Sequence, residues 1–430
     1  MLSTLLAASL AAAAAASPPP VLASLERVEP PLEAFYQELH RSPELSLMEV
    51  KTSAKMAERL RELGFEVTTG VGGHGVVGVL RNGKGPTVLL RTDMDALPIR
   101  EETGLAYAST VTGTDYTGAT VPVMHACGHD VHMTSWIGAA TLLAGAKSRW
   151  RGTLVMVGQP AEELIRGAKA MIDDGLFKRF PRPDYALAIH VSPWLRAGQV
   201  GFPSGPALAS SNTVEIVVHG RGGHGAMPQL AVDPVLVASR IVVALQGIVA
   251  REIDPLDPSV ITVGSIHGGT KSNIIPDEVK LQITVRSYKE EVQKHLLEAI
   301  ARVAKGEAAA SGTPREPTIT IAEGAVKATI NDAALADRLR SALRRSLGDG
   351  AVGEVPPIMG SEDFSEFGYA GIPSTLMWVG TVRDDATAKL ARVGKAPGVH
   401  TSRFAPEMTP TLRTGMSTLA VAATELLGKP

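Results

Sequence analysis

The chain has 430 residues, of which 44% are hydrophobic and 20% are charged, and its formal net charge is −2. This length exceeds that of one ordinary domain core and predicts two or three domains, while the composition is typical of a soluble globular protein. The near-neutral net charge does not favour a nucleic-acid partner. The single cysteine excludes an internal disulfide.

The first 24 residues are predicted to be a signal peptide, and the predicted fold begins at residue 25. Positions 1–16 are almost entirely Leu and Ala, and Ala16 and Ala23 offer cleavage sites. No Lys or Arg precedes Arg27, so a plain Ala/Pro tail is the alternative. We expect a periplasmic or secreted protein, or a cytoplasmic one if the segment is not a signal. The segment is short for a transmembrane helix, and no stable membrane insertion is expected elsewhere.

The next part of the chain, up to residue 205, predicts an α/β domain. Apolar residues recur at helical spacing over residues 31–63, where Gly64 follows as a stop. Short apolar runs predict strands at 76–80, 87–90, 153–157 and 185–189, and helical patterns lie at 134–146 and 164–177. Strands alternating with helices indicate a mostly parallel central sheet.

Residues 206–325 predict a separate α+β domain inserted into the first. The expected elements are a strand at 213–219, a helix at 234–250, strands at 260–266 and 279–285, a helix at 290–309 and a strand at 318–321. This β-α-β-β-α-β order is the ferredoxin-like arrangement. The α/β domain, residues 25–205, then resumes over 326–430 with a helix at 333–347, a strand at 375–379 and a helix at 409–427.

Residues 125–132 form the densest group of possible metal ligands. They hold three of the chain's 11 histidines together with Cys127 and Asp130. Thiolate, imidazole and carboxylate are the ligands of zinc-like metals. Gly128 permits a sharp turn, so Cys127 and His129 can point at one site. The alternative is a capped turn with surface histidines, because Asp130 precedes a helical pattern and is a possible N-cap.

Further candidates follow the predicted strands. Glu162 and Glu163 come after the strand at 153–157, where open α/β sheets place their ligands. One of these glutamates could be a metal ligand and the other a general base. The alternative is that both lie at the solvated start of a helix. Three more candidates are weak individually, namely the Asp93 and Asp95 pair after the strand at 87–90, His190 after the strand at 185–189, and His400 before the last helix. Their convergence at one sheet edge predicts a metal site.

These motifs resemble those of a family of di-metal amidohydrolases that includes aminoacylases, hippurate hydrolases and plant indole-acetyl-amino-acid hydrolases. The resemblance spans about residues 40–404 and rests on ordered motifs at 92–98, 125–130, 159–163, 222–228, 272–276 and 359–364. It implies a metal-dependent hydrolase that cleaves the amide bond of N-acyl amino acids. It also implies two divalent cations per subunit, Zn²⁺ or Mn²⁺, a small-molecule or short-peptide substrate, and a homodimer or higher homo-oligomer.

The resemblance also implies roles for individual residues. The metal ligands would be Cys127, His129, Glu163, His190 and His400, with Cys127 able to bridge the ions. Glu162 would be the general acid/base, and His224 from the inserted domain of the dimer partner would stabilise the oxyanion. Asn273 and Arg286 would hold the substrate's carboxylate, for which a planar guanidinium is suited; a surface ion pair is the alternative for Arg286. Residues that would support the ligands are Asp93, Asp95, Asp130 and Glu362, although many relatives have a metal-binding His where this chain has Asp93.

Other functions remain open. A carboxypeptidase or dipeptidase would use the same metal site. A non-catalytic binding protein would use metal only to stabilise its fold, but structural zinc sites close with four ligands and lack an adjacent free carboxylate such as Glu162. A cysteine nucleophile would leave the glutamates and His400 unexplained.

Overall fold

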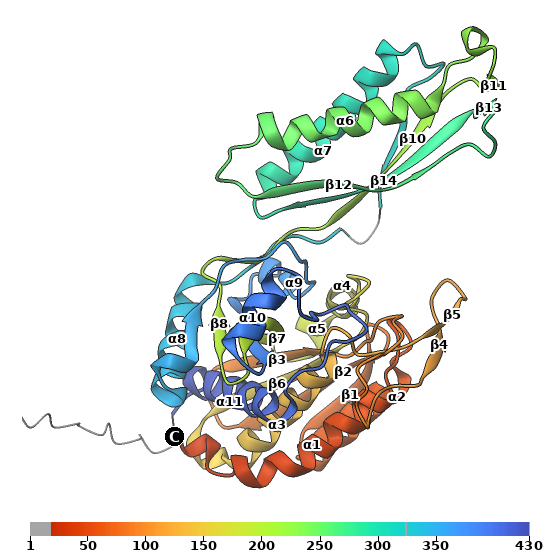
Figure 1. Cartoon of the computed structure of the whole chain (residues 1–430). Helices are drawn as coiled ribbons and strands as arrows, with labels where there is room; N and C mark the ends of the chain where they lie inside the picture. The colour runs from red at the N-terminus through yellow and green to blue at the C-terminus, as the bar shows by residue number, and fades with distance from the viewer. Residues whose placement is uncertain (1–18, 323–324, 430) are drawn as a thin grey trace, which may run out of the picture.

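The computed structural model describes residues 19–322 and 325–429, which form two lobes (Figure 1). The large lobe is built from both ends of the chain. The smaller lobe, which we call the lid, is built from the middle of the chain, residues 212–321. The chain passes between the lobes twice, and the short strands β9 (Pro206–Leu208) and β16 (Thr329–Ile330) pair at this junction.

The large lobe is organised around one mixed sheet of eight strands in the order β1-β2-β6-β3-β7-β18-β8-β17. Strand β3 is parallel to β6 and β7, β18 to β7, and β17 to β8, whereas the β1–β2, β2–β6 and β18–β8 pairs are antiparallel. The α/β class with a mostly parallel sheet is therefore confirmed. The strands are β1 (Glu66–Val71), β2 (Gly75–Asn82), β3 (Thr87–Asp93), β6 (Gly152–Gln159), β7 (Tyr185–Arg196), β8 (Val200–Phe202), β17 (Val352–Glu354) and β18 (Ser374–Val382).

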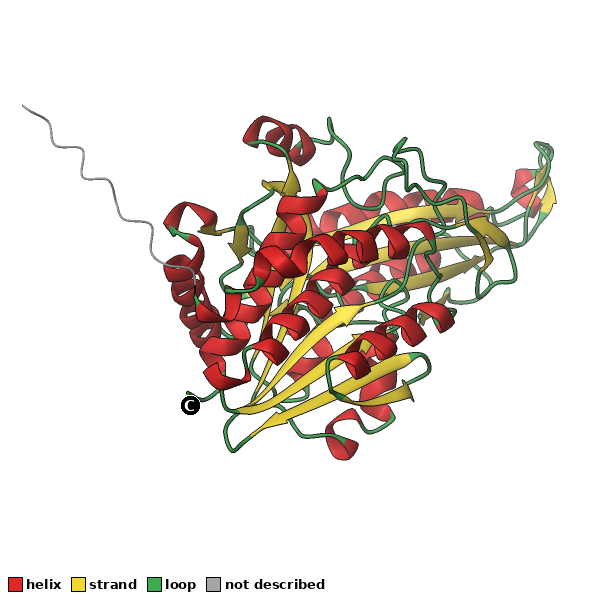
Figure 2. Ribbon diagram, turned by 90° about the horizontal axis from the view of Figure 1, so that it is seen from below, coloured by secondary structure: helices red, strands yellow, loops and turns green. Residues whose placement is uncertain are grey.

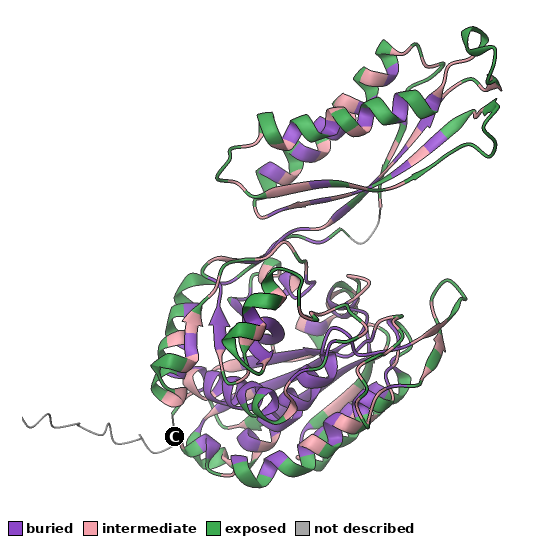
Figure 3. Cartoon of the chain, viewed as in Figure 1, coloured by how far each residue is buried: buried purple, intermediate pink, exposed green. Residues whose placement is uncertain are grey.

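Helices cover both faces of this sheet, because its central strands are apolar on both sides (Figure 2). One face packs on a core formed with α1 (Leu25–Arg41), α2 (Val50–Glu62), α3 (His129–Gly145), α8 (Ala333–Leu347) and α11 (Met408–Leu426). The other face packs on shorter elements, among them α4 (Gly167–Asp173), α5 (Leu176–Arg179) and α9 (Ser365–Tyr369). Helix α3 is buried nearly all round, which explains its apolar composition (Figure 3). Elements at the rim are the hairpin β4–β5 (Thr112–Thr114, Thr120–Pro122) and α10 (Asp385–Arg392).

Two predicted helices are each divided in the structure. The pattern over 31–63 becomes α1 and α2 with a loop between them, since Pro43 disfavours the helical conformation at Ser42, which has φ −133°. The pattern over 164–177 becomes α4 and α5, which are separated by a turn at Gly175, where φ is +88°. In both places local backbone conformation interrupts a stretch of helical spacing.

The packed chain begins before residue 25. Residues 1–18 of the predicted signal peptide lie outside the described residues. The remainder is ordered: Pro20–Leu22 form a short 3-10 helix whose Val21 and Leu22 side chains are buried in the main core. Residues 19–24 therefore belong to the fold of the large lobe, because their apolar side chains contribute to its core.

The lid is a four-stranded antiparallel sheet with two helices on one face. Its elements are β10 (Asn212–His219), α6 (Pro234–Glu252), β12 (Ser259–His267), β14 (Glu278–Ser287), α7 (Glu290–Ala310) and β15 (Thr318–Ile321). The sheet order β12-β14-β10-β15 is that of a ferredoxin-like fold, as predicted. The lid has a core of its own, and the short β11 (Gly223–His224) and β13 (Ile274–Ile275) pair at its far end (Figure 1).

Helix α6 is long and apolar enough to cross a membrane by length and composition, which the sequence analysis does not anticipate. One face of α6 packs into the lid core through Val237, Ile241 and Leu245. On another face Arg240 pairs with Glu307 of α7 at 2.9 Å. Its apolar composition is therefore accounted for in part by packing within the lid.

Candidate metal centre

The candidate ligands lie at the carboxyl edge of the large sheet and in the adjoining loops. His129 is the first residue of α3, and Cys127 lies two residues before it. Gly128 between them has φ +80°, and a Cβ atom there would lie 2.7 Å from the Val191 side chain. Only glycine combines this left-handed backbone with so close an approach. The turn thus presents the Cys127 and His129 side chains on one side.

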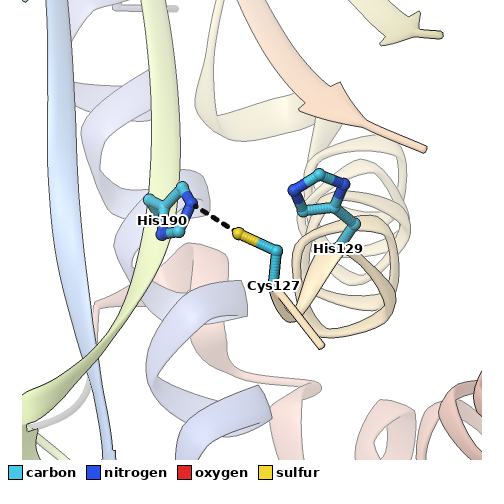
Figure 4. A group of neighbouring side chains, drawn as sticks. All are labelled: Cys127, His129 and His190. Carbon is cyan, nitrogen blue, oxygen red and sulfur yellow. Dashed lines mark hydrogen bonds between the residues drawn. The ribbon is translucent and has the colours of Figure 1, made fainter. Parts of the chain in front are cut away.

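Cys127 contacts two histidines from distant parts of the chain. Its Sγ lies 3.5 Å from Nε2 of His190, which projects from β7, and 3.2 Å from Nε2 of His400. Figure 4 shows Cys127, His129 and His190 around one space, with the Cys127–His190 contact dashed. His400 is held with φ +62°, an unusual value for a residue other than glycine. Ala161 and Ile165, on either side of the glutamate pair, also have positive φ.

Glu163 joins the same cluster after strand β6. Its Oε1 lies 3.5 Å from Nε2 of His400 and 3.8 Å from Nε2 of His129. Two groups of ligand atoms, each with all members within 4.8 Å of one another, share Cys127. They are Cys127 with His129 and His190, and Cys127 with Glu163 and His400. The five predicted ligands therefore meet.

Hydrogen bonds orient the two buried histidines. Nδ1 of His129 donates to the Asp95 carbonyl at 2.7 Å, and Nδ1 of His190 donates to the Val191 carbonyl at 2.9 Å. A neutral imidazole that donates from Nδ1 carries its lone pair on Nε2. Both Nε2 atoms face the cluster, so the tautomers are those of metal ligands.

The cluster's unsatisfied atoms fit a bound cation. Among the described residues, His129 Nε2 and Glu163 Oε1 are buried without a hydrogen-bond partner. Leaving such atoms unpaired costs about 1–3 kcal/mol each. Burial, and next the nearby Glu163, raise the pKa of the Cys127 thiol well above its usual range. Positive charge in the cluster is what would stabilise its thiolate and satisfy both orphaned atoms.

Behind the ligands lies a buried ion-pair network centred on Arg91, which sequence reasoning missed. Its guanidinium donates to Asp93 at 2.8 Å, Glu362 at 2.8 Å and Asp363 at 3.2 Å, and its Nε donates to Gln159 at 2.9 Å. Burial would lower the pKa of Arg91, but these carboxylates outweigh it and raise the pKa. The available signal was a charged residue continuing the apolar run Thr87–Leu90.

The predicted supporting acids contact the ligands or their neighbours. The Asp95 carboxylate accepts from the Ser46 hydroxyl at 2.6 Å and from the Glu163 amide at 3.0 Å. Because its carbonyl also accepts from His129, Asp95 links two ligand segments. Asp93 accepts from Nδ1 of His132 at 2.7 Å, and Nε2 of His132 in turn accepts from the Val191 amide. Both ring nitrogens of His132 thus have hydrogen-bond partners, and the residue has a structural role.

Asp130 serves a different purpose from the predicted N-cap. Gly128 is the N-cap residue of α3, and Asp130 lies inside the first turn. Its Oδ2 lies 2.6 Å from Nδ1 of His40, whose Nε2 lies 3.0 Å from Glu101. Burial would lower the pKa of His40, but its hydrogen bonds to Asp130 and Glu101 outweigh burial and raise the pKa to about 10. A buried, protonated His40 therefore anchors the start of α3 on α1.

Glu162 is buried beside the ligands but belongs to neither of the two ligand groups that share Cys127. Its Oε2 lies 3.9 Å from Nε2 of His129, and it also groups with Glu362 and Asp363. Burial, and next the carboxylate of Glu362, raise the pKa of Glu162 well above its usual value. A raised pKa lets a carboxyl group hold a proton more readily, as a general acid/base must.

The cluster opens into a cleft of about 530 Å³ that reaches the lobe junction. Arg286 of β14 lines this cleft, and its Nη1 donates to the Ser361 hydroxyl at 2.6 Å. His224 and Asn273 do not line it. They lie together at the far end of the lid, where the Gly225 amide donates to the Asn273 carbonyl at 2.8 Å (Figure 1). A single chain thus brings Arg286 to the cluster but leaves His224 and Asn273 away from it.

Comparisons with known proteins agree with this geometry. The model of peptidase family M20/M25/M40 matches residues 89–393. Thermostable carboxypeptidase 1 of Saccharolobus solfataricus is 39% identical over 80% of this chain and 84% of that protein. Hippurate hydrolase of Campylobacter jejuni is 38% identical over 78% of this chain and 84% of that protein.

The fold has close neighbours among solved structures as well. A dinuclear metal-binding peptidase of the M20 family from Bacillus subtilis is 28% identical, with a TM-score of 0.75, and the match covers 94% of this chain and 100% of that one. The chain binds divalent metal, and small molecules or peptides are its substrates. The chain therefore belongs to peptidase family M20/M25/M40 and is a hydrolase of amide or peptide bonds.

Proposed function

We propose that this chain hydrolyses the amide bond of N-acyl amino acids. The observation that carries the proposal is a buried Glu162, 3.9 Å from Nε2 of His129, beside a ligand cluster that opens into a substrate-sized cleft. A purely structural metal site would be closed by its ligands. The likeness to hippurate hydrolase, whose name describes an N-acyl amino acid substrate, supports the same class.

Two cations would be held by Cys127, His129, Glu163, His190 and His400. The two ligand groups share Cys127, one extending to His129 and His190 and the other to Glu163 and His400. A thiolate ligand favours Zn²⁺ over Mn²⁺. When bound, such cations supply Lewis acidity that acidifies water and polarises an amide carbonyl.

Glu162 performs the proton transfers in this mechanism. Its carboxylate takes a proton from the attacking water, and the resulting carboxylic acid gives that proton to the departing amine nitrogen. The raised pKa of Glu162 favours the second step, because it lets the group hold the proton between the two events. Arg286, at the junction end of the cleft, binds the carboxylate of the amino acid.

His224 would act in the site of a partner subunit. The Ala226 amide donates to Nδ1 of His224 at 3.0 Å, so this exposed ring carries its proton on Nε2 and can donate it to an oxyanion. The lid offers two surfaces for a homodimer. β12 is a sheet edge, and α6 exposes Leu236 and Val243, which are 61% and 74% exposed. Asn273, beside His224, would arrive with it.

The proposal is tested by comparing neighbouring glutamates. Glu162→Ala is expected to keep its metal content and lose turnover, whereas Glu163→Ala is expected to lose metal. Normal hydrolysis by Glu162→Ala would remove the assigned base. Wild-type protein is assayed on N-acyl amino acids and on dipeptides, because a relative named as a carboxypeptidase is 39% identical. Preferential dipeptide hydrolysis would assign the chain to peptidases instead.

The partner's role has its own test. Glu162→Ala and His224→Ala homodimers should both be inactive, but a mixed dimer would hold one site with both residues intact. Mixing the variants should therefore restore part of the activity. Failure to do so, with heterodimers verified by mass, would exclude the contribution across subunits.

Export to the periplasm or medium is also proposed from the Leu/Ala-rich start of the chain. The test is N-terminal sequencing of protein recovered from each cell fraction. A mature start within residues 17–24 outside the cytoplasm would support export, and an intact Met1 in the cytoplasm would oppose it.

A further inference from the structure

A second, smaller cavity adjoins the cleft and takes no part in the mechanism above. Its volume is about 240 Å³, and its apolar lining consists of Trp194, Leu195, Val355, Pro356, Ile358 and Trp378. The remaining lining residues are Ser192 and Arg392. Arg392 is exposed, and its Nη2 donates to the Trp194 carbonyl at 3.3 Å. The cavity therefore has an apolar interior with polar groups limited to two positions.

The small cavity lies one side chain away from the metal ligands. Trp194, Ile358 and Trp378 line both the small cavity and the cleft. Trp378 is paired with His190 in the β18–β7 register, and their rings meet edge-on with centroids 5.2 Å apart. A substrate held at the ligand cluster therefore lies next to a wall that the cavity shares with the cleft.

The walls of the cavity are set by close packing on strand β8. Gly201 lies opposite Trp378 in the β18–β8 pairing. A Cβ atom at Gly201 would lie 2.7 Å from Val355 and 2.9 Å from Leu195. These two side chains thus rest directly on the backbone of Gly201. The contact with Gly201 therefore fixes where the Val355 side chain stands in the wall of the cavity.

We propose that this cavity receives the acyl group of the substrate and selects aromatic acyl groups, such as benzoyl, over acetyl. The inference rests on the proposed N-acyl amino acid hydrolysis. A cavity of about 150 Å³ with an apolar lining holds benzene, so the space is sufficient for a six-membered ring. Trp194 and Trp378 offer aromatic faces or edges to such a ring. The amino acid's carboxylate belongs elsewhere, because Arg286 lines the cleft and not this cavity.

Selectivity is measured as the ratio of kcat/KM for N-benzoylglycine to kcat/KM for N-acetylglycine, with metal-loaded enzyme. Burial of an aromatic ring predicts a wild-type ratio on the order of 10–100. Val355→Phe fills the cavity and is expected to lower this ratio about tenfold or more. The matched control is Val393→Phe, since Val393 is 65% exposed and lies outside the lining. It should leave the ratio unchanged. Val355→Leu intrudes less and replaces Val355→Phe if that variant does not fold.

A binding measurement tests the cavity without turnover. Benzoate is expected to change the tryptophan fluorescence of the metal-loaded protein more than acetate does, because Trp194 and Trp378 line the cavity. The benzoate response should shrink in Val355→Phe and persist in Val393→Phe.

The outcomes separate the two proposals. If neither glycine derivative is hydrolysed, the proposed function is wrong, while the benzoate titration still decides whether the cavity binds an aromatic ring. If both are hydrolysed and Val355→Phe leaves their ratio unchanged, the acyl assignment is overturned. It is also overturned if Val355→Phe impairs hydrolysis of N-acetylphenylalanine but spares N-benzoylglycine, because the cavity would then hold the side chain of the amino acid.

Discussion

Replacing Arg91 by methionine tests the ion-pair network behind the metal ligands. Arg91 is 1% exposed, and its guanidinium pairs with Asp93, Glu362 and Asp363 within 3.2 Å. Methionine fills a similar volume but leaves three buried carboxylates without their cation. Removing one partner of a buried pair costs about 3–5 kcal/mol. We expect Arg91→Met to lower the free energy of unfolding by this amount.

The matched control is Arg81→Met on strand β2 of the same sheet. Arg81 also pairs with a carboxylate, Glu66, at 2.7 Å, but its side chain is 54% exposed. A surface pair contributes about 0–1 kcal/mol, so this variant should differ little from wild type. Arg91→Lys keeps the charge but not the planar fork, and should recover only part of the loss.

Tryptophan fluorescence during urea unfolding suits this measurement. The four tryptophans, at 136, 150, 194 and 378, all lie in the large lobe, so the signal follows that lobe and not the lid. All proteins are compared after chelation, so that metal affinity does not add to the difference. If Arg91→Met and Arg81→Met unfold within about 1 kcal/mol of each other, Arg91 is not the balancing charge that its contacts indicate.

Three further changes have defined outcomes. Gly128→Ala should lower metal content and stability, because its Cβ would meet Val191 at 2.7 Å. Gly118→Ala is the control, since Gly118 has a similar φ of +88° but open space around it, and it should lower the free energy of unfolding by only about 1 kcal/mol. Equal effects of the two substitutions in thermal melts would contradict the packing argument. The folded-state pKa of His40, about 10, exceeds its unfolded value, so the stability it contributes is complete below about pH 6.5 and is lost as pH rises through 10. The difference in unfolding free energy between wild type and His40→Gln should therefore shrink by up to about 1.4 kcal/mol per pH unit over that range, and a constant difference would exclude the protonated form. A chain that starts at Ser24 lacks the buried Val21 and Leu22, and should unfold with about 3 kcal/mol less free energy than one that starts at Pro19; identical urea midpoints would show that these side chains add nothing.

Much of the candidate metal site could be predicted from sequence because its residues follow regular elements. Glu163 lies just beyond β6 and His190 projects from β7, and both strands are parallel to β3, which lies between them. The carboxyl ends of parallel strands meet at one edge of the sheet. Cys127 and His129 flank a glycine whose sharp turn is evident in the motif itself. The strands of the lid could be predicted equally well, since they alternate between buried and exposed positions.

The remaining features depend on contacts that no local pattern encodes. Arg91 and Glu362 are separated by 271 positions, and only the folded chain shows that one cation balances several acids. The small cavity is assembled from β7, β18 and the segment after β17, so its shape cannot be read from any of them alone. The position of His224 is a further case, because the motif that contains it does not show that it lies at the far end of the lid, away from the cluster.

Arg91 also connects the ion-pair network to proton transfer. Its positive charge acts on Glu162, and Glu162 must be ionised to accept a proton from water. Removing that charge raises the pKa of Glu162 further, so a larger fraction of the enzyme is protonated and inactive at a given acidic pH. The acidic limb of the kcat/KM profile of Arg91→Met should therefore move to higher pH, while Arg81→Met keeps the wild-type profile. An unshifted limb in a metal-loaded Arg91→Met enzyme would show that the network supports the ligands without tuning the proposed base.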